Sequence, residues 1–322
     1  MAVLATAAHA DPGDDYLARL ATTVRARLDA IVAAKAPKLV PPVAIAPKWQ
    51  VTKVDTIDLG APLVALLAAE LDGDRKAGEL YAVTAREVVA LGYRKGRLVP
   101  LGRIAFSGDR AVPEPRDVVG TVVVEGKEIV AAASPWVNEL RVTWNGKKLV
   151  AVGTPAPGFT VCPGERAQLA TGRNHFSNGT YNVRCRDDLV DAQGYPLRVR
   201  AELSTNSKLA VTVKRCAPAG DACKEIGKYE YPKVGVAFEI ADVDRDGMPE
   251  VIVSEASAPD AEDSVKVITL GGDDRRGRFK KSFQGGVAGL VTVDGDDPDD
   301  VPEVLAAVRF QGISRLDVWR LD

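Results

Sequence analysis

The arrangement of hydrophobic and polar residues divides the chain into one helical segment and a long series of short strands. Between Asp14 and Lys35, apolar residues recur every three or four positions, which is the spacing of an amphipathic helix. A pair of aspartates can cap its first turn, and a proline-rich stretch follows its end. From about Val43 onward the period is two, and apolar runs alternate with turn residues. The pattern predicts a helix and linker over residues 11–42 and an all-β unit over residues 43–322.

Several of the predicted strand pairs repeat one plan, in which a short polar loop joins two apolar strands. In the clearest copies, 238–256 and 289–309, an acidic loop is followed by Pro-Glu-Val at the start of the second strand. Residues 66–84 repeat the plan with a shorter loop, and residues 120–134 are a reduced copy. Repeats of this kind predict a β-propeller built from small antiparallel sheets. A pair of β-sandwiches is the alternative fold.

Five blades account best for the length of the all-β unit. Their expected bounds are 61–112, 113–158, 159–229, 230–285, and 286–322 together with 43–60. The chain ends after the third strand of the last blade, so we expect the N-terminal strand to fill the fourth place and close the ring. The third blade is the least regular, and a sixth blade or an inserted hairpin is the alternative there.

One acidic loop resembles a known repeat family. Residues 242–251 read Asp-Val-Asp-Arg-Asp-Gly-Met-Pro-Glu-Val and lie between two apolar strands. This block resembles the FG-GAP/VCBS repeat of integrin-α-like β-propellers and of many bacterial exported proteins. The resemblance covers residues 43–322 as an architecture, although the full motif occurs once, and it implies a calcium-binding loop between the first two strands of a blade. The flanking strands favour this family over the EF-hand, in which helices flank the loop.

The chemistry of this loop also indicates calcium. Calcium prefers six to eight oxygen ligands, and carboxylates at alternate positions of a tight loop can converge on one point. The expected ligands are the side chains of Asp242, Asp244, Asp246 and Glu250 and the backbone carbonyl of Met248. The family usually has Asp at the last position, where this chain has Glu. A solvated acidic turn without metal is the alternative, although four carboxylates within nine residues would then repel one another.

A second calcium site is predicted in the last repeat. Its candidate ligands are Asp294, Asp296, Asp299 and Glu303. They align with the motif only if one extra residue is allowed, and Asp297 or Asp300 can replace Asp299. The copy at 66–84 has a lysine at the third acidic position and the copy at 120–134 has no ligand set, so we expect no metal in either.

The four cysteines lie within one 62-residue window, and their spacing favours disulfides over the alternative, a zinc site. Cys216 and Cys223 flank a Pro/Gly/Asp turn, and Cys162 and Cys185 can close a second loop. Two disulfides indicate an oxidising compartment. Residues 1–10 are apolar and end in Ala-His-Ala, which resembles the end of a signal peptide. The basic segment with which a signal peptide begins does not occur before this Ala-His-Ala, and the first positive charge is Arg19. We therefore expect an exported protein that is periplasmic, cell-surface or secreted.

Charge and composition argue against nucleic-acid binding and against a membrane-spanning protein. The net charge is −2, and no clustered basic face suggests nucleic-acid binding. No apolar run is long enough to predict a membrane span. Residues 239–303 contain 17 acidic and seven basic residues, which concentrates negative charge in the last two blades. The basic run 275–281 between them is interpreted as a hairpin tip that faces water.

Catalytic motifs are scarce. The chain has two histidines, His9 and His175, and a Ser-His-Asp triad would depend on the second because the first lies in the leader. The first hypothesis is a non-catalytic, calcium-binding propeller that binds a protein or glycan partner at the cell envelope. The alternative is a carbohydrate-active propeller enzyme, a lyase or a hydrolase, which would have paired acids and aromatic residues at the central channel.

Overall fold

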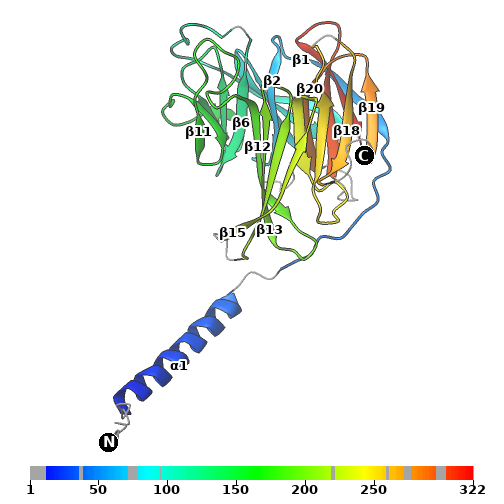
Figure 1. Cartoon of the computed structure of the whole chain (residues 1–322). Helices are drawn as coiled ribbons and strands as arrows, with labels where there is room; N and C mark the ends of the chain where they lie inside the picture. Colours follow the sequence, from blue (N-terminus) through cyan, green and yellow to red (C-terminus); the bar gives the residue numbers. More distant parts are fainter. Residues whose placement is uncertain are drawn as a thin grey trace, which may run out of the picture.

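The computed structural model describes residues 12–35, 39–71, 78–94, 96–115, 117–218, 222–258, 261–271, 277–294 and 302–321. These residues form a five-bladed β-propeller preceded by one helix, α1 (Pro12–Lys35), that stands away from the disc (Figure 1). The all-β propeller predicted from the sequence is confirmed. Within these ranges no helix is both long enough and apolar enough to cross a membrane.

Each blade is a four-stranded antiparallel sheet. The first blade contains β2 (Leu63–Ala69), β3 (Glu79–Thr84), β4 (Glu87–Arg94) and β5 (Arg97–Ala105). The second contains β6 (Gly120–Glu125), β7 (Glu128–Ala133), β8 (Leu140–Trp144) and β9 (Leu149–Ala151). The third contains β12 (Thr180–Val190), β13 (Pro196–Ser204), β14 (Leu209–Cys216) and β15 (Cys223–Tyr231). The fourth contains β16 (Val234–Ala241), β17 (Glu250–Glu255), β18 (Asp263–Thr269) and β19 (Phe279–Phe283).

The fifth blade joins the two ends of the propeller. It consists of β20 (Val287–Asp294), β21 (Pro302–Arg309) and β22 (Arg315–Leu321), with β1 (Val51–Asp58) as the outer strand beside β22. The predicted closure by an N-terminal strand is therefore confirmed. Two side chains of β1 bind Asp317 of β22: Thr56 Oγ1 donates a hydrogen bond of 2.8 Å, and Lys53 Nζ forms an ion pair of 2.8 Å.

The third blade begins later than the sequence predicts. Residues 159–167 form a separate hairpin, β10 (Phe159–Cys162) and β11 (Glu165–Ala167), which corresponds to the inserted hairpin expected as an alternative. The hairpin packs between the second and third blades, where Phe159 joins a small core with Phe176 and Val183. β10 and β11 form a two-stranded sheet of their own, and the four-stranded sheet starts at β12. The expected start of the third blade at residue 159 is therefore wrong, because the hairpin comes before the sheet of that blade.

Both predicted disulfides are present. Cys162–Cys185 connects β10 to β12 and so fastens the hairpin to the third blade. Cys216–Cys223 closes the tip of the β14–β15 hairpin, where the two cysteines face each other across the strands. The first bridge therefore joins two separate pieces of structure, whereas the second reinforces an existing strand pair.

The linker between α1 and the propeller follows one face of the disc. A Cβ atom on Gly194, in the turn after β12, would lie 2.8 Å from the backbone of Val40. Further along, the Ile45 amide donates a hydrogen bond of 2.8 Å to the carbonyl of Asp244, in the loop after β16. Trp49 then stacks on Phe279 of β19, with ring centroids 4.9 Å apart. The linker thus crosses the third and fourth blades before it enters β1.

Candidate functional site

The acidic loop between β16 and β17 brings together three of the predicted calcium ligands. One carboxylate oxygen from each of Asp242, Asp244 and Glu250 lies within 4.8 Å of the others. Asp242 follows the inner strand β16, and Glu250 opens β17, so the two strands hold the ends of the loop in place. Asp244 and Glu250 are buried. This is the only such cluster of acids, cysteines or histidines among the described residues.

Backbone amides organise the loop. The Asp242 carboxylate accepts hydrogen bonds from the amides of Asp246 (3.1 Å) and Gly247 (2.9 Å). Asp246 accepts one from the Met248 amide at 2.7 Å, and Glu250 accepts one from the Val243 amide at 3.1 Å. These bonds fold the loop inward and fix the positions of the carboxylates.

The loop is electrostatically unfavourable on its own. Burial, with Asp242 and Asp246 nearby, raises the pKa of Glu250 to about 8. Burial also raises the pKa of Asp242, and the charge of Asp246 adds to the shift. Desolvation disfavours the charged form of a carboxyl group, and a second negative charge increases that effect. The set therefore has the charge and the donor atoms that suit a hard divalent cation.

Arg278 supplies a positive charge to this loop. Its guanidinium forms an ion pair with Asp244, and lies 3.3 Å from Asp246 and 3.7 Å from Glu250. Its Nε also donates to Thr269 Oγ1 at 2.6 Å. The interpretation of the basic run 275–281 as a water-facing hairpin tip is wrong for Arg278, because its side chain turns back onto the acidic loop.

An acid and an arginine pair in the same way in every blade. The acid lies where the first strand ends or the second begins, and the arginine comes from the third strand or the loop after it. The pairs are Glu79–Arg94 (2.8 Å), Glu128–Arg141 (3.1 Å), Asp191–Arg215 (2.6 Å), Glu250–Arg278 (3.7 Å) and Glu303–Arg320 (3.0 Å). Sequence analysis missed these arginines, although an alignment of whole blades could have placed most of them in register.

The other predicted ligands have different outcomes. Asp246 faces Arg278 at the edge of the cluster. Met248 is exposed, and the role of its backbone carbonyl as a ligand stays a prediction. In the second predicted site, Asp296, Asp299 and the side chain of Asp294 lie outside the described residues. Glu303 is buried and pairs with Arg320. The second calcium site therefore stays a prediction.

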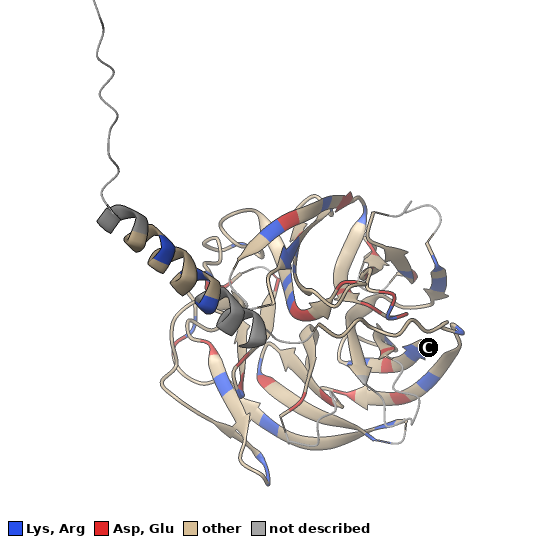
Figure 2. Cartoon of the chain, turned by 90° about the horizontal axis from the view of Figure 1, so that it is seen from below, with Lys and Arg blue, Asp and Glu red and all other residues tan. Residues whose placement is uncertain are grey.

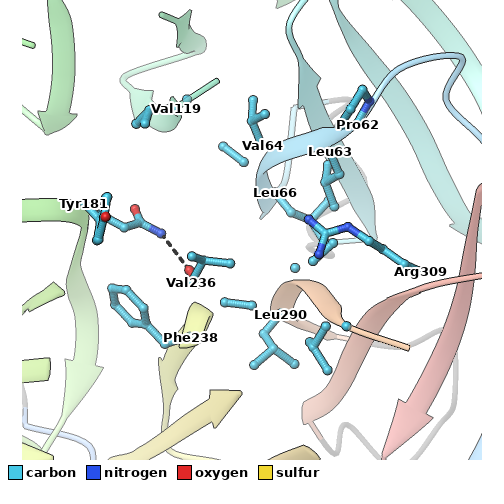
Figure 3. Close-up of a pocket in the computed structure, with 18 of the residues that line it drawn as sticks. Pro62, Leu63, Val64, Leu66, Val119, Tyr181, Val236, Phe238, Leu290 and Arg309 are labelled. Carbon is cyan, nitrogen blue, oxygen red and sulfur yellow. Dashed lines mark hydrogen bonds between the residues drawn. The ribbon is translucent and has the colours of Figure 1, made fainter. Parts of the chain in front are cut away.

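A cavity of about 670 Å³ occupies the centre of the propeller. Its walls come from the N-terminal parts of the inner strands of all five blades and from nearby loops. Leu63, Val64 and Leu66 face Val236, Phe238 and Leu290 across it, and Arg309 reaches in beside them (Figure 3). Because the acidic loop follows the C-terminal end of β16, the cavity and the loop lie at opposite ends of the inner strands.

Most polar groups of the cavity are already bonded to the protein. Asp263 accepts the amides of Glu255 (2.9 Å), Ser264 (2.7 Å) and Val287 (3.0 Å). Glu255 forms ion pairs with Lys266 (2.7 Å) and Lys280 (3.2 Å), which lower its pKa to about 2. Asp263 therefore binds backbone amides at the ends of strands, and Glu255 pairs with lysines of two neighbouring strands.

His175 lies next to the cavity-lining Tyr181. Its Nδ1 is 2.9 Å from the carbonyl oxygen of Phe176, and its ring meets Tyr181 edge-on with centroids 6.4 Å apart.

Comparisons with known proteins identify no family for the chain. No protein-family model and no curated protein sequence match the chain. Among solved structures, the chain is similar to a luciferin-regenerating enzyme, with 9% identity over 83% of this chain and 94% of that one and a TM-score of 0.37. It is also similar to BBS1N from a complex with ARL6DN (9% identity, 86% and 98% covered, TM-score 0.33). A mutant of AofleA from Arthrobotrys oligospora matches at 13% identity (77% and 66% covered, TM-score 0.34).

Proposed function

We propose that the protein is an exported, calcium-binding β-propeller of the FG-GAP/VCBS type that binds a protein or glycan partner without catalysing a reaction. The observation that carries the proposal is the convergence of Asp242, Asp244 and Glu250 between the first two strands of a blade. That is the position at which the family has its calcium loop. The hydrogen bonds from Gly247 and Asp246 to Asp242 support a loop built to present oxygen atoms.

Calcium would stabilise the contact between two blades. The loop packs against the turn after β12, because Gly247 lies against the backbone of Asp191 and Ala192. A bound ion supplies the positive charge that the buried acids need, and an ion that binds only the folded protein stabilises it by about 2.7 kcal/mol at a concentration 100 times its Kd. The proposed role of the ion is therefore structural.

Two observations support the rest of the proposal. Both disulfides suit an oxidising compartment and so agree with export. The cavity walls are mainly aliphatic, which favours binding of an apolar group over acid–base chemistry on a glycan.

The N-terminal helix is a second candidate for contact with a partner. Tyr16, Leu17, Leu20 and Val24 of α1 are all exposed. Basic residues occur along the same helix (Figure 2). In that view, acidic and basic residues are interspersed along the ribbon of the disc (Figure 2).

Calcium binding is tested by thermal unfolding of the full chain, first depleted with EGTA and then titrated with calcium or magnesium. We expect calcium to raise Tm and elemental analysis to find calcium in the untreated protein. Asp244→Asn should abolish the shift, whereas Asp109→Asn, at an exposed position, should retain it. Protein that contains no calcium and shows no shift in Tm would sink the metal assignment.

Export and partner binding need separate tests. Fractionation of the source cells, with mass spectrometry of the mature N-terminus, should place the protein outside the cytoplasm with a cleaved leader. Cross-linking of the wild type in the isolated envelope fraction should then recover one partner reproducibly. That partner should be lost when α1 is removed, or when the four exposed apolar residues of α1 are replaced by serine. A cytoplasmic protein with an intact N-terminus would contradict the export proposal.

A further inference from the structure

Arg184 is a partly buried cation that forms no ion pair with a carboxylate among the residues that the structure describes. The negative charge of Glu239 acts on it from a longer range. Arg184 lies on β12, and its Nη2 donates a hydrogen bond across the channel to the carbonyl of Leu66 on β2. Its Nε is buried without a hydrogen-bond partner in the same set of residues. Burial lowers the pKa of Arg184. The neighbouring Arg186, in contrast, pairs with Asp188 at 2.7 Å and with Glu239 at 3.3 Å.

Arg184 forms part of the floor of the central cavity. Along the inner strands, the lining residues extend as far as Leu66, Arg184, Phe238 and Leu290 and no further. The space above this floor, about 670 Å³, falls in the size range of pockets that bind small molecules. A guanidinium without an ion pair at the closed end of an apolar cavity has charge that a bound anion can neutralise.

We propose that the central cavity binds a small amphipathic carboxylate, whose charged group pairs with Arg184 and whose apolar body lies against the aliphatic walls. A guanidinium matches a carboxylate in shape and can donate two parallel hydrogen bonds to it. Arg309 adds a second positive charge on the wall beside Leu63 and Leu66 (Figure 3). Three acids line the cavity and could oppose such a ligand. Asp263 and Glu255 are held by backbone amides and by lysines, and Asp117 accepts a hydrogen bond of 3.2 Å from Asn174 Nδ2.

The apolar walls decide between kinds of anion. A sugar acid or a bare inorganic anion would leave the faces of Val64, Val119 and Val236 uncovered and would lose its own hydration. An alkyl chain would bury those faces, and each methylene removed from water contributes about 0.8 kcal/mol. The proposal is independent of the acidic loop, because the cavity lies at the other end of the inner strands.

The test is calorimetric titration of the full chain with sodium decanoate and, separately, with the uncharged decanol. We expect decanoate to bind one site per chain, and decanol to bind at least tenfold more weakly. Arg184→Gln, which keeps a donor for the Leu66 carbonyl, should weaken decanoate binding at least tenfold. Arg103→Gln is the matched control, because Arg103 is half-exposed and pairs with Glu87 at the outer strand of the first blade.

A second variant covers the case in which Arg184→Gln fails to fold. Val236 lines the cavity but is 56% exposed, so Val236→Trp fills space without disturbing the buried core. It should weaken decanoate binding while Arg184 is intact. Equal affinity for decanoate and decanol, or unchanged binding by both variants, would overturn the proposal. Absence of decanoate binding both with calcium and after EGTA would overturn it too, and would leave the calcium site unaffected.

Discussion

Gly247 of the acidic loop lies so close to Ala192 of the neighbouring blade that a Cβ atom on Gly247 would be 2.1 Å from the Ala192 backbone nitrogen. Gly247 also has a φ of +81°, a conformation that residues with a side chain rarely adopt. Two independent requirements therefore select glycine here. The conformation of the candidate metal loop and the contact between the third and fourth blades depend on each other.

Replacement of Gly247 by alanine should separate the blades at this point. We expect Gly247→Ala to lower the free energy of unfolding by more than about 2 kcal/mol, because strain at positive φ adds to displacement of a neighbouring backbone. Urea denaturation measures the change. Gly126→Ala is the control, since Gly126 has a φ of +64° with no atom within 4 Å of its Cβ position. Equal losses in the two variants would mean that the contact with Ala192 contributes nothing.

Arg278 should compete with calcium for the acidic loop. Because its guanidinium pairs with Asp244, Asp246 and Glu250, a divalent ion must displace it or tolerate its charge. We expect Arg278→Gln to bind calcium more tightly, by roughly fivefold if the ion pair contributes about 1 kcal/mol. Calorimetric titration with calcium checks this. Lys280→Gln, which removes a nearby charge that pairs with Glu255 instead, should leave the affinity within a factor of two. Weaker binding by Arg278→Gln would show that the arginine supports the site.

The two disulfides should contribute unequally to stability. Cys162 and Cys185 are 23 residues apart and join a separate hairpin to the third blade, so replacing both by serine should cost about 3 kcal/mol. Cys216 and Cys223 are seven residues apart and link strands that are already paired, so the same replacement should cost less. Urea denaturation of the two double variants measures the difference. A larger loss for the short loop would contradict the assigned role of the hairpin bridge.

Glu255 should stabilise the protein at neutral pH and not in acid. Its ion pairs with Lys266 and Lys280 lower its pKa from 4.5 to about 2 in the folded protein. A depressed pKa contributes stability that is complete above the unfolded value and is lost as the pH falls through the folded one. Wild type should therefore exceed Glu255→Gln at pH 6, by less than about 1 kcal/mol because the pair is partly exposed, and match it near pH 2. Urea denaturation at several pH values measures this difference, and a constant difference would exclude ionisation of Glu255 as its cause.

The sequence predicts those parts of the structure that local pattern determines. Strand periodicity and repeated loops are enough for five blades, closure by β1 and the convergence of Asp242, Asp244 and Glu250, because each depends on residues close together or on a repeat. Contacts between blades have no such signature. Arg184 of the third blade and the carbonyl of Leu66 in the first blade are 118 positions apart. Within the fourth blade, Arg278 meets its acids only after β18 turns back, and the spacing along the chain does not indicate that contact. The sequence also does not decide whether residues 159–167 belong to the third blade or to an inserted hairpin, because the pattern of a short apolar strand does not show which strand it pairs with.

Closure of the ring should depend on Asp317. Its buried carboxylate on β22 accepts Thr56 Oγ1 and pairs with Lys53, which both lie on β1. Asp317→Ala removes both contacts and leaves the Thr56 hydroxyl without this acceptor, at a cost of about 1–3 kcal/mol. Since β1 reaches the fifth blade from the opposite end of the sequence, the loss should first appear as local opening of this strand pair.

Hydrogen exchange distinguishes local opening from general destabilisation. In Asp317→Ala, amides of β1 that pair with β22 should exchange at least tenfold faster, while those of the central strand β13 keep their wild-type rates. Glu114→Ala, which removes an exposed ion pair with Arg110, should leave β1 unchanged. If the amides of β1 and of β13 both exchanged faster, opening of β1 would be part of global unfolding. If neither changed, the strand pairing alone would hold the ring closed, and Asp317 would have no part in closure.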